Sequence, residues 1–283
     1  QNEVIVIIGP NGAGKSTLIN ILSGAIEPTS GTVRLFNGPP IKRFQLLQDI
    51  IGVCFQDNVL VNLLSIKEHF ELFGAFRDIH PTEIQETMMA YSDMLQLNEM
   101  LKTRACDLSG GQKRKLCIAL SLLGDPPIVI MDEPTAGVDV QSRHLIWKTI
   151  AAQKHTTTIV TSHALEEAEA VSSRLFVVSN GQIPFRGTST ELRNQFKCGY
   201  NLRIDGNVSN GLAVVQKYYP NAHISADRPD TIEFQVSSNV PLIISEIEAN
   251  KANLEIDSFS ISVEQLEDVL LKLIQHDEAS YLQ

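Results

Sequence analysis

Apolar and polar positions follow two different periods along the chain, and each period predicts one kind of element. Val4 to Ile8 is apolar at successive positions, which predicts a strand that is buried on both faces. A glycine-rich turn over Gly9–Gly14 ends this strand, and helical spacing follows over Lys15–Leu22. Short strands are predicted next over Thr32–Phe36 and Ile50–Phe55.

The middle of the chain is predicted to be helical. From Ser65 to Leu97 the apolar residues recur at steps of three and four, with a break near His80-Pro81, because proline cannot continue a helix. This block interrupts an otherwise regular alternation of strands and helices. We therefore expect an inserted helical subdomain over about residues 57–124.

Strands and helices alternate again after this block. The predicted strands are Ile128–Met131, Thr158–Thr161 and Leu175–Val178, and the predicted helices are Val140–Ala152 and Leu165–Val171. Such an alternation predicts a mostly parallel sheet with helices on both faces.

The pattern changes after Phe196. Strands are predicted over residues 201–205, 222–226, 231–236 and 254–262, and helices over 211–219, 240–252 and 263–274. The order is β-α-β-β-α-β plus a helix, which is typical of a ferredoxin-like α+β domain. We place the domain boundary near Cys198-Gly199, which gives domains over residues 1–198 and 199–283.

Composition narrows the possible functions. Lysine and arginine number 23 against 33 aspartate and glutamate, for a formal charge of −10. We expect no nucleic-acid partner, because a general nucleic-acid binder needs a basic face. The four cysteines form no C-x-x-C pair, so reduced thiols are expected rather than disulfides or a zinc site. No apolar run approaches the roughly 18–20 residues that cross a bilayer, and we expect the chain to be a piece of a longer protein.

The glycine-rich turn carries the first chemistry. It fits the pattern G-x-x-x-x-G-K-[ST] and lies between a predicted strand and a predicted helix, as a phosphate-binding loop requires. Its glycines let backbone N–H groups converge on phosphates at a helix N-terminus. Lys15 supplies a positive charge, and the Ser16 hydroxyl can ligate Mg²⁺. The predicted phosphate-binding residues are Gly9, Pro10, Asn11, Gly12, Ala13, Gly14, Lys15, Ser16 and Thr17.

An acidic pair ends the predicted strand Ile128–Met131. Asp132 at this strand end can hold a metal ion through water, and Glu133 follows it, placed to polarise an attacking water. On the same chain as a phosphate-binding loop, this pair indicates a nucleotide triphosphatase rather than a solvated acidic loop.

Four further motifs resemble landmarks of ATP-binding-cassette (ABC) proteins, in the order of that family. Leu108-Ser109-Gly110-Gly111-Gln112 resembles the signature motif, and Gln56 matches the Q-loop glutamine. Asp139 matches the D-loop aspartate, and His163 matches the switch histidine. The resemblance covers residues 1–198 and implies a P-loop ABC-type core with the helical subdomain inserted.

The resemblance also implies roles for these residues, with ATP and Mg²⁺ as cofactors. Ser16, Gln56 and Asp132 would complete the Mg²⁺ shell, and Glu133 would be the general base. Lys15 and His163 would contact the γ-phosphate. The signature residues Ser109, Gly110, Gly111 and Gln112 would cap a nucleotide bound by a second cassette, identical or in the same polypeptide.

Two features outside these landmarks carry expectations of their own. Family members usually stack adenine on an aromatic residue upstream of the phosphate-binding loop. No such segment precedes the loop here, so we expect weaker adenine affinity, since base–aromatic stacking is worth about 1–3 kcal/mol. Lys113, Arg114 and Lys115 follow the signature, either as surface charge or as a supplement to its anion site.

Several stretches are similar to the A subfamily, which contains many lipid transporters. They are Ile51–Leu60, Gly111–Leu116, Asp132–Asp139, and in the tail Thr231–Ser237 and Phe259–Leu270, where the resemblance is to a small regulatory domain. This implies a motor domain at the cytoplasmic face of a membrane, whose partners are the transmembrane domains of the same transporter. The region from Gln56 to Phe76 is where we expect it to touch them.

Three other functions remain open. A soluble ABC ATPase acting on ribosomes or DNA shares the same motifs, and the acidic charge argues against it. A non-catalytic ATP-binding module would not need the intact Glu133 and His163. P-loop kinases lack a signature such as Leu108–Gln112.

Overall fold

The computed structural model describes residues 2–36, 38–41, 50–162, 169–195, 199–226, 228–235 and 239–263. The chain divides into two compact units, residues 1–188 and 189–283. The division precedes the boundary expected near Cys198, because α7 (Ser189–Gln195), a short helix that the sequence pattern did not predict, belongs to the second unit. Each unit is described by itself.

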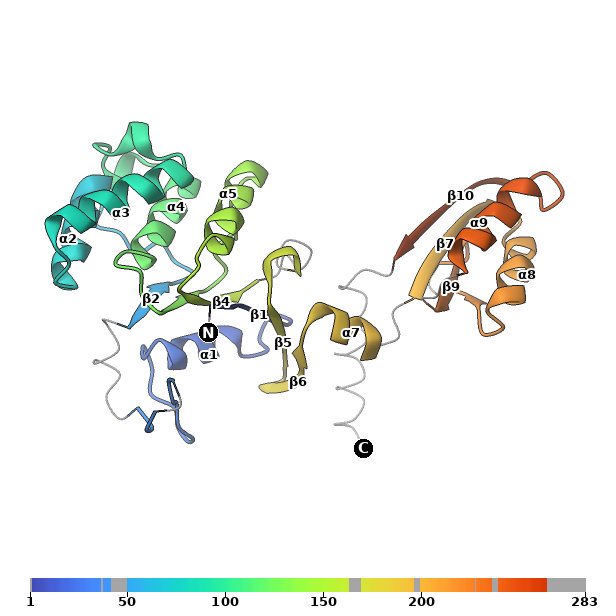
Figure 1. Cartoon of the computed structure of the whole chain (residues 1–283), viewed down its shortest axis with the longest axis horizontal. Helices are drawn as coiled ribbons and strands as arrows, with labels where there is room; N and C mark the ends of the chain where they lie inside the picture. Colours follow the sequence, from blue (N-terminus) through green and yellow to red (C-terminus); the bar gives the residue numbers. More distant parts are fainter. Residues whose placement is uncertain are drawn as a thin grey trace. The chain divides into compact units, whose positions relative to one another are not determined.

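The first unit is built on a six-stranded sheet in the order β2-β3-β4-β1-β5-β6 (Figure 1). Five strands are mutually parallel, and β6 is antiparallel to β5. Their bounds are β1 (Val4–Ile8), β2 (Ile51–Cys54), β3 (Ile128–Met131), β4 (Thr157–Thr161), β5 (Arg174–Ser179) and β6 (Gln182–Gly187). The predicted α/β fold with a mostly parallel sheet is confirmed.

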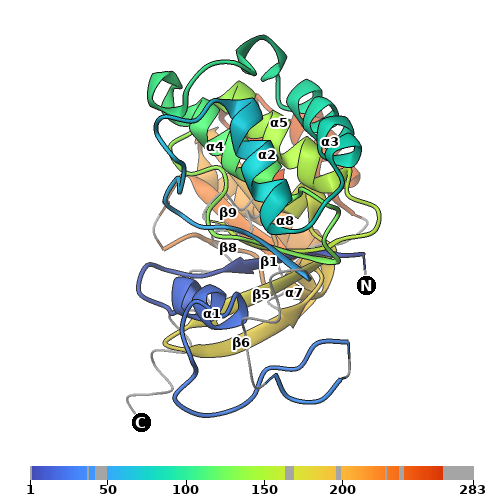
Figure 2. The ribbon, with the colours of Figure 1, turned by 90° about the vertical axis from the view of Figure 1, so that its left-hand side faces the viewer.

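Helices cover both faces of this sheet. Figure 2 shows α1 (Lys15–Leu22) on one side and the other helices of the unit on the opposite side, namely α2 (Ile66–Phe76), α3 (Pro81–Met94), α4 (Gly110–Ser121) and α5 (Val140–Ala151). On the α1 side, a core cluster joins Ile7 of β1, Ile19 of α1 and Ile130 of β3. β1 is therefore buried on both faces, as its unbroken apolar run predicts.

The helical block begins and breaks where the sequence indicates. Ser65 caps α2 in a capping box with Glu68, and Pro81 occupies the first turn of α3. The predicted break near His80-Pro81 is confirmed. One-turn 3₁₀ helices at Asn98–Met100 and Ala105–Asp107 connect α3 to α4.

One strand prediction was wrong, and one strand was not predicted. No strand forms over Thr32–Phe36, because the chain turns at Phe36 (φ 51°) and folds back, with the Ile41 N–H bonded to the Val33 carbonyl at 2.9 Å. Strand β6 was not predicted, although Asn180-Gly181 is a strong hairpin signal with both residues at positive φ. The helices expected over 165–171 and 263–274 lie largely outside the described residues.

The second unit has a four-stranded antiparallel sheet in the order β10-β7-β9-β8. Its elements are β7 (Gly199–Gly206), α8 (Val208–Tyr218), β8 (His223–Ile224), β9 (Thr231–Gln235), α9 (Val240–Ala249) and β10 (Ile256–Val263). Val215 of α8 and Ile243 of α9 pack with Leu202 and Ile232 of the sheet. In chain order the strands lie 4-1-3-2, so the predicted β-α-β-β-α-β pattern is confirmed.

Candidate active site

The glycine-rich loop connects β1 to α1 and has no room for side chains at its start. A Cβ on Gly9 would lie 2.1 Å from the main-chain oxygen of Val178, which only glycine avoids. Gly12 (φ 80°) and Gly14 (φ 104°) adopt the left-handed conformation, and Gly14 is the N-cap of α1. The loop therefore turns tightly into a helix N-terminus, where free N–H groups favour an anion.

Lys15 lies across this loop. Its Nζ donates hydrogen bonds to the main-chain oxygens of Gly9 (2.9 Å) and Pro10 (3.0 Å), and the residue is only 6% exposed. Burial lowers the pKa of the ammonium, while the carboxylates of Glu133 and Asp132 oppose this shift. A partly desolvated cation so placed is suited to a phosphate group.

The two predicted acids follow β3 directly. Asp132 is buried, and its carboxylate accepts a hydrogen bond from the Thr161 hydroxyl at the end of β4. The same hydroxyl accepts the N–H of Glu133 at 2.9 Å. Glu133 has a φ of 47°, an uncommon value outside glycine and one that often marks functional positions. One threonine thus fixes both acids at the carboxyl edge of the sheet.

Gln56 lies at the same edge. It follows β2, and β2 is tied to the acidic pair because the Asp132 N–H donates to the Cys54 carbonyl at 2.8 Å. The Gln56 residue is exposed, so its amide is free of the core. The structure therefore brings the ends of β1, β2 and β3 together, and with them Lys15, Gln56, Asp132 and Glu133.

The oxygen donors at this edge fit Mg²⁺. Ser16 contributes a hydroxyl, Gln56 an amide oxygen and Asp132 a carboxylate, which are the hard ligands that this ion prefers. Among the described residues, no group of three or more histidine, cysteine, aspartate or glutamate side chains could hold a metal ion.

The signature residues form a second helix N-terminus. Ser109 is the N-cap of α4, and its hydroxyl accepts the Gln112 N–H at 3.3 Å while the Gln112 side chain accepts the Ser109 N–H at 2.8 Å. The capping box uses the side-chain oxygen of Gln112 as an acceptor. The N–H groups of Gly110 and Gly111, in the first turn, have no acceptor within the helix. The prediction that Ser109–Gly111 opens a helix is confirmed.

The D-loop aspartate lies beside the signature. A Cβ on Gly111 would be 3.7 Å from the Asp139 carboxylate. Asp139 caps α5 by accepting the Ser142 N–H at 2.9 Å, and this hydrogen bond lowers the pKa of the carboxyl. The switch residue His163 lies outside the described residues, which continue to Ser162 on its N-terminal side.

Sequence reasoning missed two residues that support the site, Thr161, described above, and Arg114. Arg114 is 3% exposed, rather than surface charge, and its guanidinium donates to main-chain oxygens beyond both β2 and β3. Its helical spacing with buried Cys117 and Ile118 indicated an inward position. The run of three basic residues concealed that signal.

Comparison with known proteins agrees with this geometry. Residues 1–136 match the family described as ABC transporter. ABC transporter A family member 4 of Dictyostelium discoideum is 33% identical over 99% of this chain and 18% of its own length. Cholesterol transporter ABCA5 of Homo sapiens is 33% identical over 98% of this chain and also 18% of its own length. The chain thus spans less than a fifth of these relatives.

Solved structures match about two thirds of the chain. The ATP-binding subunit of an ABC transporter is 28% identical with a TM-score of 0.62, over 69% of this chain and 82% of that one. The ATP-binding cassette MJ0796, a dimer in a post-hydrolysis state bound to ADP and Pi, is 27% identical with a TM-score of 0.60, over 66% of this chain and 85% of that one. The chain belongs to the ABC transporter family, among A-family relatives, and carries its ATP-hydrolysing cassette.

Proposed function

We propose that the chain is the ATP-driven motor of a membrane transporter that moves a lipid or a lipid-like substrate. The observation that carries the proposal is that Lys15, held across the glycine-rich loop, lies within electrostatic reach of Asp132 and Glu133 at the end of β3. The substrate class is inferred from relatives such as the cholesterol transporter ABCA5, which match nearly the whole chain. The transport path would lie in parts of the protein beyond this chain.

Each predicted residue has a task in hydrolysis. The N–H groups of Gly9–Thr17 bind the phosphates of ATP, and Lys15 neutralises charge on the β- and γ-phosphates. Ser16, Gln56 and Asp132 would hold Mg²⁺, which would stabilise the charge that develops on the phosphates. Glu133 polarises the attacking water, and His163 contacts the γ-phosphate.

A second cassette completes the site in this proposal. The N–H groups at the start of α4, behind Ser109, would cap the nucleotide bound by the partner cassette. The dimeric post-hydrolysis structure of MJ0796 supports such pairing. ATP then favours the closed pair because it binds that state more tightly, and hydrolysis removes the preference.

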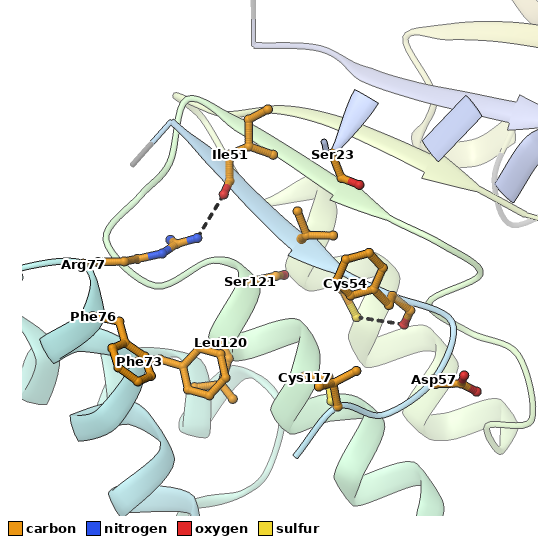
Figure 3. Close-up of a pocket in the computed structure, with 13 residues that line it drawn as sticks. Ser23, Ile51, Cys54, Asp57, Phe73, Phe76, Arg77, Cys117, Leu120 and Ser121 are labelled. Atoms are coloured by element: carbon orange, nitrogen blue, oxygen red, sulfur yellow. Dashed lines mark hydrogen bonds between the residues drawn. The ribbon is translucent and has the colours of Figure 1, made fainter. Parts of the chain in front are cut away.

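A pocket in the helical part offers a surface for the membrane domains. It has a volume of about 350 Å³ and is lined by β2, α2 and α4, with Phe73 and Phe76 on one side and Cys117 on another (Figure 3). Two of the residues that line it are exposed and apolar, Val59 (65% exposed) and Phe76 (75%). We propose that a segment of the transmembrane domains docks here, with the cassette at the cytoplasmic face.

None of the helices among the described residues is both long and apolar enough to cross a bilayer.

The proposal is tested by the solution mass of the Glu133→Gln variant, measured by light scattering with and without Mg-ATP. Blocking hydrolysis should trap the closed state, so ATP should shift the variant from monomer to dimer. Glu71→Gln, which removes the same charge from the exposed surface of α2, should show no such shift.

A Glu133→Gln variant that binds Mg-ATP and stays monomeric would contradict pairing between identical cassettes. Lys15→Ala tests the nucleotide site separately, and should abolish ATP binding. Unchanged hydrolysis by Lys15→Ala would refute the phosphate-binding role of the loop.

A further inference from the structure

Arg114 connects three parts of the active site through one side chain. It lies on α4, in the second turn after the signature residue Ser109, and its side chain is buried. Its Nε donates to the Pro134 carbonyl at 3.0 Å, and Nη2 donates to the Asp132 carbonyl. Its Nη1 donates to the carbonyls of Phe55 and Gln56, the latter at 3.0 Å.

These four acceptors belong to the segments that carry the hydrolytic residues. Phe55 and Gln56 follow β2 and form the start of the Q-loop, whereas Asp132 and Pro134 lie on either side of Glu133 after β3. Because the bonds reach main-chain atoms, they fix the path of the backbone and leave the side chains of Gln56, Asp132 and Glu133 for nucleotide chemistry.

We propose that Arg114 is a positioning residue for ATP hydrolysis. It holds the Q-loop and the acidic strand end in register with the signature helix, so that Gln56 and Glu133 keep their places relative to each other. This role rests on the proposed function, since it presumes that these residues act on ATP. It also couples the two nucleotide faces of the cassette, because the same helix opens with the signature that would cap the partner's ATP.

The geometry requires arginine specifically. A guanidinium presents five N–H donors in a rigid plane, and here Nε, Nη1 and Nη2 each have their own main-chain acceptor, on two separate stretches of backbone. A lysine ammonium is a single point with three donors on a flexible stem, and cannot span this fork. Arg114→Lys therefore keeps the charge and removes the bracing.

The chain provides a matched control in Arg77. This arginine also ties two segments together by hydrogen bonds to main-chain atoms, donating to the Leu123 carbonyl at 2.6 Å. It also donates to the Ile51 carbonyl at 3.0 Å (Figure 3). Arg77 thus connects the beginning of β2 to the chain just after α4. Arg114, which lies within α4, is instead bonded to the segment that follows the end of β2. Loss of Arg77 should affect stability without displacing Gln56 or Glu133.

The test compares the wild-type chain, Arg114→Lys, Arg114→Met and Arg77→Lys. Steady-state hydrolysis gives kcat and KM, Mg-ATP affinity is measured by titration calorimetry, and thermal melting reports stability. We expect Arg114→Lys to lower kcat at least tenfold while the Kd for Mg-ATP changes less than threefold, because the phosphate-binding loop does not involve Arg114. Arg77→Lys should lower the melting temperature comparably and leave kcat within twofold of wild type.

Two results would overturn the role of Arg114: a kcat within twofold of wild type in Arg114→Lys, or an equal loss of kcat in Arg77→Lys. If Arg114→Met fails to fold, Arg114→Lys alone still tests the proposal, because lysine retains the charge and the approximate length of arginine. The proposed function fails differently, through absence of ATP hydrolysis in the wild-type chain.

A double-variant cycle gives a second, independent measurement. If Arg114 acts partly through the position of Gln56, then Arg114→Lys should reduce kcat less in a Gln56→Ala background than in the wild type. Strictly additive losses would show that Arg114 does not act through Gln56.

Discussion

The hydroxyl of Thr161, at the end of β4, donates a hydrogen bond to the buried carboxylate of Asp132, at the end of β3. The same hydroxyl accepts the N–H of Glu133 at 2.9 Å. Thr161 is itself fully buried. The Asp132 carboxylate and the Glu133 N–H therefore cannot exchange this hydroxyl for water unless the ends of the strands move. One side chain on a neighbouring strand thus orients both acids of the site.

Thr161→Val should therefore impair the orientation of the two acids, although valine has the same shape as threonine. Removal of the hydroxyl leaves the Glu133 N–H without this acceptor and the Asp132 carboxylate without this donor, which should cost about 1–3 kcal/mol of unfolding free energy. We expect kcat to fall and Mg-ATP affinity to change little, as measured by denaturant titration and steady-state kinetics.

Thr158→Val is the matched control on the same strand. Thr158 is also fully buried, but its hydroxyl has no hydrogen-bond partner within the described part of the chain. The substitution should be neutral or stabilising and should leave kcat unchanged. Equal losses in the two variants would mean that the hydrogen bonds of Thr161 are not what orients the acids.

Gly9→Ala should disrupt the phosphate-binding loop. The added Cβ would lie 2.1 Å from the Val178 carbonyl oxygen, so the loop or the end of β5 must move. At Gly12 (φ 80°) a Cβ would meet no atom within 4 Å, and only the backbone strain of about 1–2 kcal/mol remains. Calorimetric titration with Mg-ATP should show lost binding for Gly9→Ala and retained binding for Gly12→Ala. Comparable affinities would contradict the close contact with β5.

Two capping boxes separate helix stability from nucleotide chemistry. Ser65 caps α2 with Glu68, and Ser109 caps α4 with Gln112, by the same pair of hydrogen bonds. Ser65→Ala and Ser109→Ala should each lower stability by about 1 kcal/mol, the usual value of an N-cap. Only Ser109→Ala should also weaken ATP-dependent pairing of Glu133→Gln chains in light scattering. Weakened pairing in both would assign the effect to helix stability alone.

The buried thiols should make the chain sensitive to alkaline pH. Burial raises the pKa of Cys54 to about 11 and that of Cys117 to about 12, from the ordinary value of 9.0. A thiol with a raised native pKa favours the folded state below its unfolded pKa, and this contribution is lost as pH rises from about 9 toward the native value.

Cys117→Val removes one of these titrating thiols. The change of side chain also alters the unfolding free energy, but by the same amount at every pH. The unfolding free energy of both proteins should fall between pH 8 and pH 10, and the fall should be about 1.4 kcal/mol smaller in the variant. This difference is the free energy that the wild type loses because one more thiol ionises in its unfolded state. Parallel losses in denaturant titrations would contradict the burial of Cys117. In the native chain at pH 8, maleimide should label the exposed Cys106 and spare Cys54 and Cys117.

Much of the nucleotide site could be predicted because its residues follow strands in local order. The run Val4–Ile8, the loop after it and the acids after Ile128–Met131 each have a pattern that a few neighbouring residues determine. Parallel strands then bring their carboxyl ends to one edge, which places Lys15 and Asp132 at the same edge of the sheet. The helix that opens behind Ser109 was predictable for the same reason.

The remaining features depend on contacts between distant residues. The buried position of Arg114 depends on backbone oxygens 18 to 59 residues away, and its own neighbours are two lysines. Thr32–Phe36 has strand-forming residues, but a strand needs a partner, and the structure provides one isolated bridge at Arg34 and Pro40. Strand β6 was not predicted, although Asn180-Gly181 is a typical hairpin turn. This turn contacts the phosphate-binding loop, because the Gly181 N–H donates a hydrogen bond to the Ala13 carbonyl at 3.0 Å.

The position of β1 has a consequence for synthesis of the protein. Both neighbours of β1 follow it by a long stretch of chain, since Val4 pairs with Thr158 and Ile5 with Arg174. At roughly 5–20 residues per second, a ribosome needs on the order of ten to thirty seconds to make the intervening chain. Throughout that time an apolar strand with unpaired edges is exposed, so chaperone demand should be greatest before β4 and β5 emerge.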